Sequence, residues 1–550
     1  MTTVHPIQPT HIRLGLPPKG WRLLIILLLI MGIFFRFVNI DRKIYWTDEV
    51  YTSLRISGYT EKEFLQNVAK GEAITQKELH SYQKLNANKT IFDTVKGLAV
   101  EEPQMTPLYF ILIRFWAQLF GDSIATIRSF STLINLLSFP LVYWLCVELF
   151  ESSLVGWVAL GLFSVSPLQI VYAQEARPYS LFMAAILLSH IALWRALGVK
   201  TNKSYGFYAL TVVLGLYSHL LFAFVALGHG LYVLLIEKLR WTPTVKNYIL
   251  ASTIAVLGFT PWIFVLLRYS KSATEKLSWQ SFKLSPLDTL KNWILNIVRG
   301  FFDVGFYTNY SKIYLIFFLP ALLISILLIV YALYFFLEKN DAKNKFYFLS
   351  ISIILLPTIT IVYDLVKGSF LSMVTRYYLP SAIGIQLAVS YLITTKITES
   401  TRKKLWQGIF ILMTSLGLFS GVIMTQNSTW WNKAISSPTL KIAPLIKSSQ
   451  STLIITDVYD KINDESTYRI GSLMCLSYQL DPQIKYMVVL SPNMPQFSQN
   501  EFSDIFLYNP SPTLTNSLRN DLNWKLKFLY ESHQYPRMFL WKLERRSRSE

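Results

Sequence analysis

Two adjacent carboxylates follow the first apolar run of the chain. Asp48 and Glu49 lie in a segment, 45–52, that is rich in the aromatic residues typical of a membrane interface. Partial desolvation there raises a carboxyl pKa toward the range of a general base. The same acids also suit the first turn of a helix with Thr47 as its N-cap. Because neighbouring side chains leave a helix in different directions, one acid can do chemistry while the other is structural.

Further polar residues lie at the junctions of later apolar runs. Glu175 and Arg177 occupy one junction, where charged side chains of a membrane protein are candidates for function. A local ion pair between them that fixes the turn is the alternative. His219 lies at the next junction on the same side. It could bind a phosphate, a sugar hydroxyl or a metal, or be a structural histidine.

Several cations are expected on the same side as these acids. Arg376 begins a late apolar run, where its guanidinium could bind a phosphate or simply reach the interface from a helix end. The segment 269–311 adds an excess of basic over acidic residues, namely Lys271, Lys276, Lys283, Lys291 and Arg299 against Glu275, Asp288 and Asp303. An enzyme that handles a membrane-embedded phosphate donor needs such a set. No Gly-rich phosphate loop or dinucleotide fingerprint occurs, so no nucleotide cofactor is expected.

The elements that must position these residues are membrane spans. The 550 residues are 52% hydrophobic and 15% charged, against about 25% charged in an average soluble domain. Apolar runs near the length of a membrane span recur along the chain. We therefore predict an all-α polytopic membrane protein with about eleven spans, at 21–37, 124–149, 153–172, 178–197, 204–218, 219–236, 247–268, 312–337, 346–365, 377–395 and 404–425.

The net charge of +19 is expected to report orientation more than function. The segment 107–120 carries Arg114 and is too short for a hydrocarbon core of about 30 Å, so we predict an interfacial or re-entrant helix. Five segments then share one side and hold 16 Lys/Arg against 4 Asp/Glu, namely 1–22, 195–204, 237–246, 338–345 and 396–404. The positive-inside rule places the N-terminus in the cytoplasm. No basic stripe with interleaved aromatics or zinc-finger spacing occurs, so nucleic acid is not an expected partner.

Two units follow from this layout. Residues 1–425 form the transmembrane domain, with 41–123 as its first extracytoplasmic loop, and 426–550 form a soluble extracytoplasmic domain. The tail contains strand-like runs at 453–456, 486–490 and 504–508, separated by turns, which predicts a small α/β fold. The two cysteines, Cys146 and Cys475, lie in different environments and predict neither a disulfide framework nor a cysteine metal site.

The order of motifs along 20–400 resembles that of the GT-C integral-membrane glycosyltransferases. The similarity is to the bacterial branch related to protein O-mannosyltransferases and to the lipid A aminoarabinose transferase. It rests on Trp46-Thr47-Asp48-Glu49, Thr106-Pro107-Leu108-Tyr109, Leu119-Phe120-Gly121, Arg128, Gln174-Glu175-Ala176-Arg177-Pro178-Tyr179, Tyr217-Ser218-His219, Pro261-Trp262 and Arg376-Tyr377. The family often has His-Pro-Pro-Leu where this chain has Met105-Thr106-Pro107-Leu108.

The resemblance implies a reaction. A sugar would pass from a polyprenyl-phosphate carrier to a lipid, glycan or protein hydroxyl on the outer face of the plasma membrane, with inversion at the anomeric carbon. Asp48, with Glu49 beside it, would be the catalytic base and Glu175 the second acid. Arg376, with Arg177 and His219, would hold the donor phosphate. Some members bind a divalent metal near the acids, which would place one at Asp48 and Glu175.

A glycolipid transporter or flippase without transferase activity is the alternative. It would share the spans and the cationic surface. Transporters place charged residues near the bilayer midplane inside broken helices, whereas the candidate residues here lie at helix ends. Convergence of Asp48, Glu175 and Arg376 on one outward cavity at the membrane surface would favour the enzyme, and separation of Asp48 and Glu175 on unrelated faces would argue against it.

Overall fold

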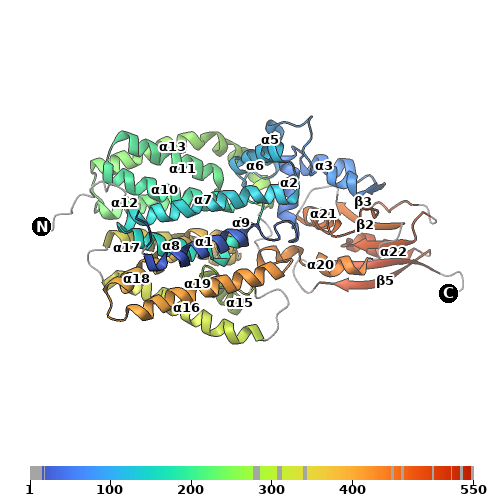
Figure 1. Cartoon of the computed structure of the whole chain (residues 1–550). Helices are drawn as coiled ribbons and strands as arrows, with labels where there is room; N and C mark the ends of the chain where they lie inside the picture. The colour runs from blue at the N-terminus through green and yellow to red at the C-terminus, as the bar shows by residue number, and fades with distance from the viewer. Residues whose placement is uncertain are drawn as a thin grey trace.

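The chain folds into a helical bundle with a mixed sheet at one end (Figure 1). The computed structural model describes residues 15–17, 19–276, 285–305, 313–338, 343–446, 451–459, 464–497, 501–521, 523–532 and 537–546. The first described helix begins at the end of the bundle away from the sheet, and the last described strand belongs to the sheet itself. Lys283 lies outside the described residues.

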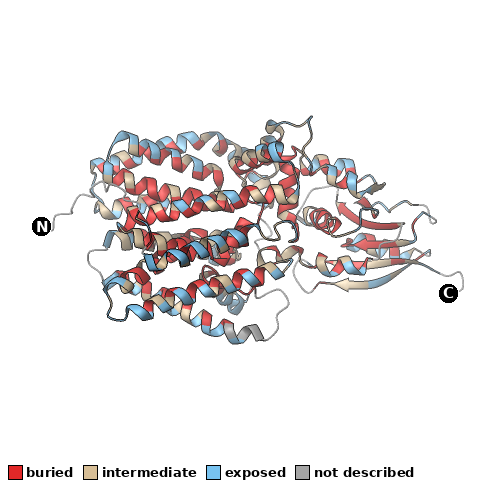
Figure 2. Cartoon of the chain, in the orientation of Figure 1, coloured by how far each residue is buried: buried red, intermediate tan, exposed pale blue. Residues whose placement is uncertain are grey.

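Helices of 7 to 27 residues form the bundle. They are α1 (Arg22–Phe37), α7 (Ile124–Phe150), α8 (Ser153–Ser164), α9 (Pro167–Ala173), α10 (Tyr179–Val199), α11 (Asn202–Ser218), α12 (Phe222–Ile236), α13 (Pro243–Arg268), α16 (Ile313–Glu338), α17 (Lys343–Lys367), α18 (Leu379–Glu399) and α19 (Lys403–Gln426). Their inner faces are buried, whereas their outer faces expose large apolar side chains such as Leu257, Leu319 and Leu365 (Figure 2). An apolar outer face is typical of helices that contact lipid.

Among the described helices, eight are long and apolar enough to cross a membrane, or nine if the bent pair α8–α9 is one span. All eleven predicted spans correspond to bundle helices, but α11 and α12 have only 17 and 15 residues. The predicted class, a polytopic α-helical membrane protein with a small C-terminal α/β part, is confirmed. The count of eleven stays a prediction, because it depends on these two short helices.

The helix at 107–120 does not carry the chain across the bundle. It is α6 (Pro107–Phe120), and it packs against α2 (Thr47–Ile56), α5 (Ile91–Glu101), α7 and α11. Arg128, near the start of α7, donates to the carbonyl oxygens of Ile40, Lys43 and Ile44, directly after α1. The end of α1 and the start of α7 therefore lie at the same end of the bundle, as the charge pattern requires.

A break between α8 and α9 directs the chain toward the sheet end. The two helices meet at 61°, with Pro167 opening α9. The fully buried Arg36 of α1 donates to the carbonyl oxygens of Phe163 and Ser164, the last of α8, and to Asn135 Oδ1. A cation at a helix C-terminus satisfies carbonyls that have no partner within the helix. Arg36 thus holds the end of α8 at the break, and the turn after α9 carries Glu175.

Short helices cover the sheet end of the bundle. The remaining elements of the transmembrane part are η1 (Lys19–Trp21), α3 (Glu61–Val68), β1 (Ala73–Thr75), α4 (Gln76–Ser81), α14 (Ser270–Lys276), α15 (Pro286–Val298), η4 (Leu371–Met373) and η5 (Thr375–Tyr378). Asp364 accepts from the backbone N–H groups of Leu371 and Ser372, and Asn296 donates to the carbonyl of Met373. These bonds fix the short segment from which Arg376 projects.

The tail forms most of a six-stranded sheet of order β1-β3-β2-β4-β6-β5. Strands β3, β2 and β4 are parallel, and the three predicted strands are confirmed in β2, β3 and β4. The β5–β6 hairpin was not predicted, although its pattern partly alternates. The tail elements are η6 (Trp431–Ser436), α20 (Thr439–Ile442), η7 (Ala443–Leu445), β2 (Thr452–Tyr459), α21 (Asp464–Ser477), β3 (Lys485–Ser491), β4 (Asp504–Tyr508), α22 (Pro512–Asn520), β5 (Trp524–Glu531) and β6 (Phe539–Arg545).

The first loop is built into this sheet. Strand β1, from residues 73–75, pairs antiparallel with β3. Helix α21 packs against α2, and Gly471 permits the approach, because a Cβ there would lie 2.7 Å from Thr47 and 2.8 Å from Tyr51. The boundary predicted at residue 426 stays a prediction, since the two parts share a sheet.

Thr47 is not the N-cap of α2, contrary to the prediction. The helix begins at Thr47 itself and the capping position is Trp46, which makes no side-chain cap. The Thr47 hydroxyl instead lies 3.0 Å from Ser436 Oγ of the tail. A tertiary contact has replaced the local one that the sequence favours.

Candidate active site

Helix α2 presents Asp48 and Glu49 to different surroundings. The side chain of Asp48 keeps 29% of its surface exposed, whereas that of Glu49 is fully buried. The helix is held between α6 of the bundle and α21 of the tail. The two acids therefore have different environments, as neighbouring positions on a helix predict.

Glu49 is saturated with donors. Arg128 binds both of its carboxylate oxygens, at 2.7 and 2.6 Å, Lys433 Nζ donates at 2.8 Å, and the backbone N–H of Ala176 donates at 2.9 Å. Burial alone would raise the pKa of Glu49, but the charges of Arg128 and Lys433 outweigh burial and hold that pKa at about 2. Such a carboxylate is a poor proton acceptor at neutral pH. The geometry favours Glu49 as an anchor, and its predicted catalytic role is not supported by these contacts.

Replacing Glu49 by glutamine should destabilise the protein. The change would leave Arg128 and Lys433 buried without their counter-charge, which costs about 3–5 kcal/mol for a buried pair. Thermal unfolding in detergent measures the loss. The matched control is Glu151→Gln. Glu151 is exposed, and its pair with Lys345 spans 3.9 Å and should contribute about 0–1 kcal/mol. Equal unfolding midpoints for Glu49→Gln and wild type would contradict the anchoring role.

Asp48 faces two guanidinium groups. Arg376 Nη1 lies 3.3 Å from Asp48 Oδ2, and Arg177 Nη2 lies 3.7 Å from the same oxygen. Arg177 also donates to the Asp48 carbonyl and to Thr52 Oγ1, which fixes it against α2. Arg376 is 20% exposed and lies near the rings of Tyr179 and Tyr377. One partly exposed carboxylate and two cations thus meet at the sheet end of the bundle.

Glu175 lies in the same cluster. It is almost fully buried, and Asn432 Nδ2 donates to its Oε2 at 2.8 Å. Burial raises the pKa of Glu175 to about 7, and the charges of Glu49 and Asp48 add to this while that of Lys433 opposes it. The alternative of a Glu175–Arg177 ion pair is wrong for the described residues, because Arg177 contacts Asp48 instead.

His219 lies beside the two arginines. Its ring stacks on Phe182, with centroids 4.7 Å apart, and its Nδ1 accepts from the backbone N–H of Leu221 at 3.2 Å. Burial, with the nearby charges of Arg376 and Arg177, lowers the pKa of His219 to about 3. The ring is therefore neutral at physiological pH. Because Nδ1 accepts, Nε2 carries the proton and is a neutral hydrogen-bond donor.

Part of the chain matches a model of a known protein family. The family model described as dolichyl-phosphate-mannose-protein mannosyltransferase matches residues 102–264. Over that segment the chain is similar to this family. The resemblance to GT-C glycosyltransferases that the motif order predicts is thereby confirmed. The matched segment contains Arg128, Glu175, Arg177 and His219, whereas Asp48 and Arg376 lie outside it.

Two solved structures show similarity to the chain over most of its length. One is ArnT from Cupriavidus metallidurans bound to undecaprenyl phosphate, with 13% identity, a TM-score of 0.44, and coverage of 95% of this chain and 98% of that one. The other is the archaeal oligosaccharyltransferase AglB from Archaeoglobus fulgidus in complex with an inhibitory peptide and a dolichol-phosphate, with 10% identity, a TM-score of 0.43, and coverage of 86% and 65%. A search of the curated proteins finds no match.

Two of the cations expected from the segment 269–311 lie away from Asp48. Lys276 binds Glu61 and Thr467 instead, between the first loop and the tail. Arg299 is buried against Trp431, 4.0 Å from its ring centroid, and donates to Asn296 and Thr375. Arg299 therefore contacts the residue next to Arg376, but it does not itself contact Asp48.

Two site residues were missed from the sequence. Asn432 and Lys433 belong to η6, a few residues after α19, and they reach Glu175 and Glu49. A lysine within a few residues of a span end, in the tail that the topology places outside, was the available signal. It is weak, because interfacial lysines are common.

The residues at Asp48 and Glu175 do not fit a divalent metal well. Among the described residues no group of three or more His, Cys, Asp or Glu side chains is arranged to hold a metal ion. Arg177 and Arg376 contact Asp48, and Lys433 lies near Glu175, so cations already surround both acids.

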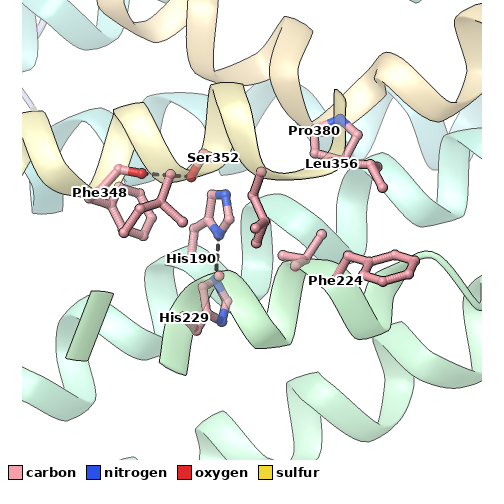
Figure 3. Close-up of a pocket in the computed structure, with 11 residues that line it drawn as sticks. His190, Phe224, His229, Phe348, Ser352, Leu356 and Pro380 are labelled. Atoms are coloured by element: carbon pink, nitrogen blue, oxygen red, sulfur yellow. Dashed lines mark hydrogen bonds between the residues drawn. The ribbon is translucent and has the colours of Figure 1, made fainter. Parts of the chain in front are cut away.

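A second polar pair lies inside the bundle. His190 Nδ1 and His229 Nε2 are 2.8 Å apart beside a cavity of about 20 Å³, lined also by Phe348 and Ser352 (Figure 3). His229 Nδ1 lies 3.0 Å from the hydroxyl of Tyr208. Both ring nitrogens of His229 are therefore used within the helix packing. The pair links α10, α11 and α12, and none of the candidate site residues lines this cavity.

Proposed function

We propose that the protein is an inverting glycosyltransferase that moves a hexosyl or pentosyl group from a polyprenyl-phosphate carrier to a hydroxyl of a lipid, glycan or protein. One observation carries the proposal: Asp48, Arg376 and Arg177 meet at one end of the bundle. A base beside two phosphate-binding cations is what this reaction needs. The family matched over 102–264 is described by a dolichyl-phosphate-mannose donor, which supports the same class of donor.

In the proposed reaction, Asp48 takes the proton of the acceptor hydroxyl. The acceptor oxygen attacks the anomeric carbon from the face opposite the phosphate, and the bond between that carbon and the phosphate oxygen breaks. Arg376 and Arg177 bind the phosphate and stabilise its charge as it leaves. The neutral His219 donates through Nε2 as a further candidate ligand of the phosphate or the sugar.

The proposed location is the outer face of the plasma membrane. The sheet end of the bundle carries the candidate site, and helix α1 begins at the opposite end (Figure 1). The basic segments 195–204, 237–246 and 396–404 connect helices at the end away from the site. The positive-inside rule would then put the N-terminus in the cytoplasm and the sheet outside. The candidate charges lie at helix ends, which supports the enzyme over the flippase.

A transfer assay tests the function. The full chain in lipid nanodiscs is mixed with polyprenyl-phosphate mannose or a polyprenyl-phosphate pentose, labelled in the sugar, and with an envelope extract as acceptor. We expect the label to leave the carrier while polyprenyl phosphate appears. A flippase would instead move the intact labelled lipid between leaflets of a vesicle. Donors that stay intact while crossing the bilayer would overturn the proposal.

A further inference from the structure

A buried polar cluster holds the segment that carries Arg376. Thr375 directly precedes Arg376 in η5 and is buried, whereas the Arg376 side chain is partly exposed. The partners of the Thr375 hydroxyl, Asn296 and Arg299, lie at the end of α15 and are also buried. We call Thr375, Asn296 and Arg299 together the Thr375 clamp.

The hydroxyl of Thr375 both accepts and donates. Its Oγ1 accepts a hydrogen bond from Arg299 Nη1 at 2.6 Å and donates one to Asn296 Oδ1 at 2.6 Å. Arg299 Nη1 also donates to Asn296 Oδ1, at 2.7 Å, which closes the clamp. A hydroxyl that is used in both ways has a fixed direction, and its bond to a charged donor is stronger than a neutral one. The backbone at Thr375 therefore cannot shift without breaking these bonds.

The clamp is itself anchored to the bundle and to the tail. The carbonyl of Arg299 accepts from the backbone N–H of Leu168 on α9 at 3.1 Å. The next carbonyl, that of Gly300, accepts from Gln386 Nε2 on α18 at 2.8 Å. The Arg299 guanidinium lies 4.0 Å from the ring centroid of Trp431, a distance at which a cation and an aromatic ring attract each other. Two bundle helices and the tail thus fix the base of the clamp.

The neighbouring turn η4 is held by other bonds. Asp364 accepts from two backbone N–H groups of η4, and Asn296 Nδ2 donates to the carbonyl of Met373 at 3.0 Å. None of these three bonds uses the hydroxyl of Thr375. Loss of that hydroxyl should therefore loosen η5, and Arg376 with it, while η4 keeps its place.

We propose that Thr375 is a positioning residue for the sugar transfer: its hydroxyl, clamped between Arg299 and Asn296, holds Arg376 where it meets the donor phosphate. This inference rests on the proposed function. Arginine has a long side chain, and a cation that is already held in place loses less conformational entropy when its ligand binds. The Arg376 guanidinium lies 3.3 Å from Asp48, so a shift of η5 would displace the cation relative to the base as well as the phosphate.

Steady-state transfer kinetics of Thr375→Val test this role. Valine keeps the shape of the side chain but neither donates nor accepts a hydrogen bond. We expect the KM for the lipid donor to rise roughly 3- to 10-fold, the size of one net hydrogen bond, and the KM for the acceptor to stay unchanged. Thr375→Ser keeps the hydroxyl and should restore the wild-type donor KM.

The matched control is Thr414→Val. Thr414 is buried in α19, and its hydroxyl donates to the carbonyls of Phe410 and Ile411 in its own helix. The substitution removes the same hydroxyl from a different part of the bundle. Its donor KM should equal that of the wild type.

A double variant separates positioning from a merely structural role. If Thr375 acts through Arg376, then Thr375→Val should not raise the donor KM further in the Arg376→Ala background. The full rise in that background overturns the proposal. A structural role lowers the amount of folded protein and the maximal rate but leaves the donor KM of Thr375→Val unchanged, and that outcome also overturns it. So does a donor KM that Thr375→Ser leaves raised.

Equilibrium binding of polyprenyl phosphate without a sugar gives a readout that needs no transfer. The full chain in lipid nanodiscs is titrated with this lipid. Thr375→Val should bind it roughly 3- to 10-fold more weakly than the wild type, and Thr375→Ser should bind it equally well. Equal binding by Thr375→Val and the wild type would overturn the proposal alone. Absence of binding to the wild type would overturn the proposed donor, and this inference with it, so the two failures are distinguishable.

Discussion

Sugar transfer should fall by roughly 10²- to 10⁴-fold when Asp48 is replaced by asparagine. The amide keeps the size of the carboxyl and a contact for Arg376 and Arg177, but it cannot take the proton of an acceptor hydroxyl. Asp48 is partly exposed, so the variant should accumulate to the wild-type level. Initial rates of sugar loss from a labelled polyprenyl-phosphate donor measure the effect at saturating acceptor.

The control for this experiment is another acid of the same loop. Glu72 is exposed, and Glu72→Gln removes one carboxylate from this end of the protein without touching the cluster. Its transfer rate should equal that of the wild type. Full transfer by Asp48→Asn, with normal protein level, would show that a different residue is the base.

The second large effect is expected at Arg376. A hydrogen bond to a charged group contributes about 1.5–3 kcal/mol, so Arg376→Ala should raise the KM for the lipid donor roughly 10- to 100-fold. Because the alanine variant also loses charge stabilisation of the departing phosphate, kcat should fall as well. Arg376→Lys should recover part of the affinity, since lysine keeps the charge but not the fork of donors.

Arg268 offers the matched cation. It lies at the end of α13, is exposed, and stacks near Tyr269 rather than near Asp48. Arg268→Ala should leave the donor KM unchanged, which separates a specific phosphate contact from a general loss of surface charge. Equal donor KM values for Arg376→Ala and wild type would remove Arg376 from the phosphate site.

Local sequence patterns were sufficient to predict the bundle helices and to select several of the acidic residues of the candidate site. Apolar runs of about 20 residues become helices because lipid satisfies no backbone hydrogen bond. Each span could therefore be predicted from its own sequence. Asp48, Glu175 and Arg376 were found because they lie at junctions of apolar runs that the topology assigns to the same side of the membrane. The topology then placed them at one end, and the structure brings them together.

Contacts between residues far apart in the sequence could not be predicted. Glu49 is bound by Arg128 and Lys433, which lie 79 and 384 residues away. No local pattern distinguishes an acid with these partners from an acid free to accept a proton. Strand β1 has only three residues, and it forms because it pairs with β3. Thr47 shows the same limit, since its hydroxyl turns to Ser436 rather than to its own helix.

The edge position of β1 bears on how the protein can be divided. A fragment that begins at residue 426 would carry β3 with the unpaired backbone groups that β1 normally covers. An uncovered strand edge is a template for joining other chains, so such a fragment should self-associate when it is made alone. The complementary fragment would lose Ser436 and Gly471 from the surface of α2 and leave Glu49 with one cation fewer. We therefore expect the two parts to fold together. The first loop, which contributes β1, is synthesised early, but the strand that β1 pairs with is synthesised near the end of the chain.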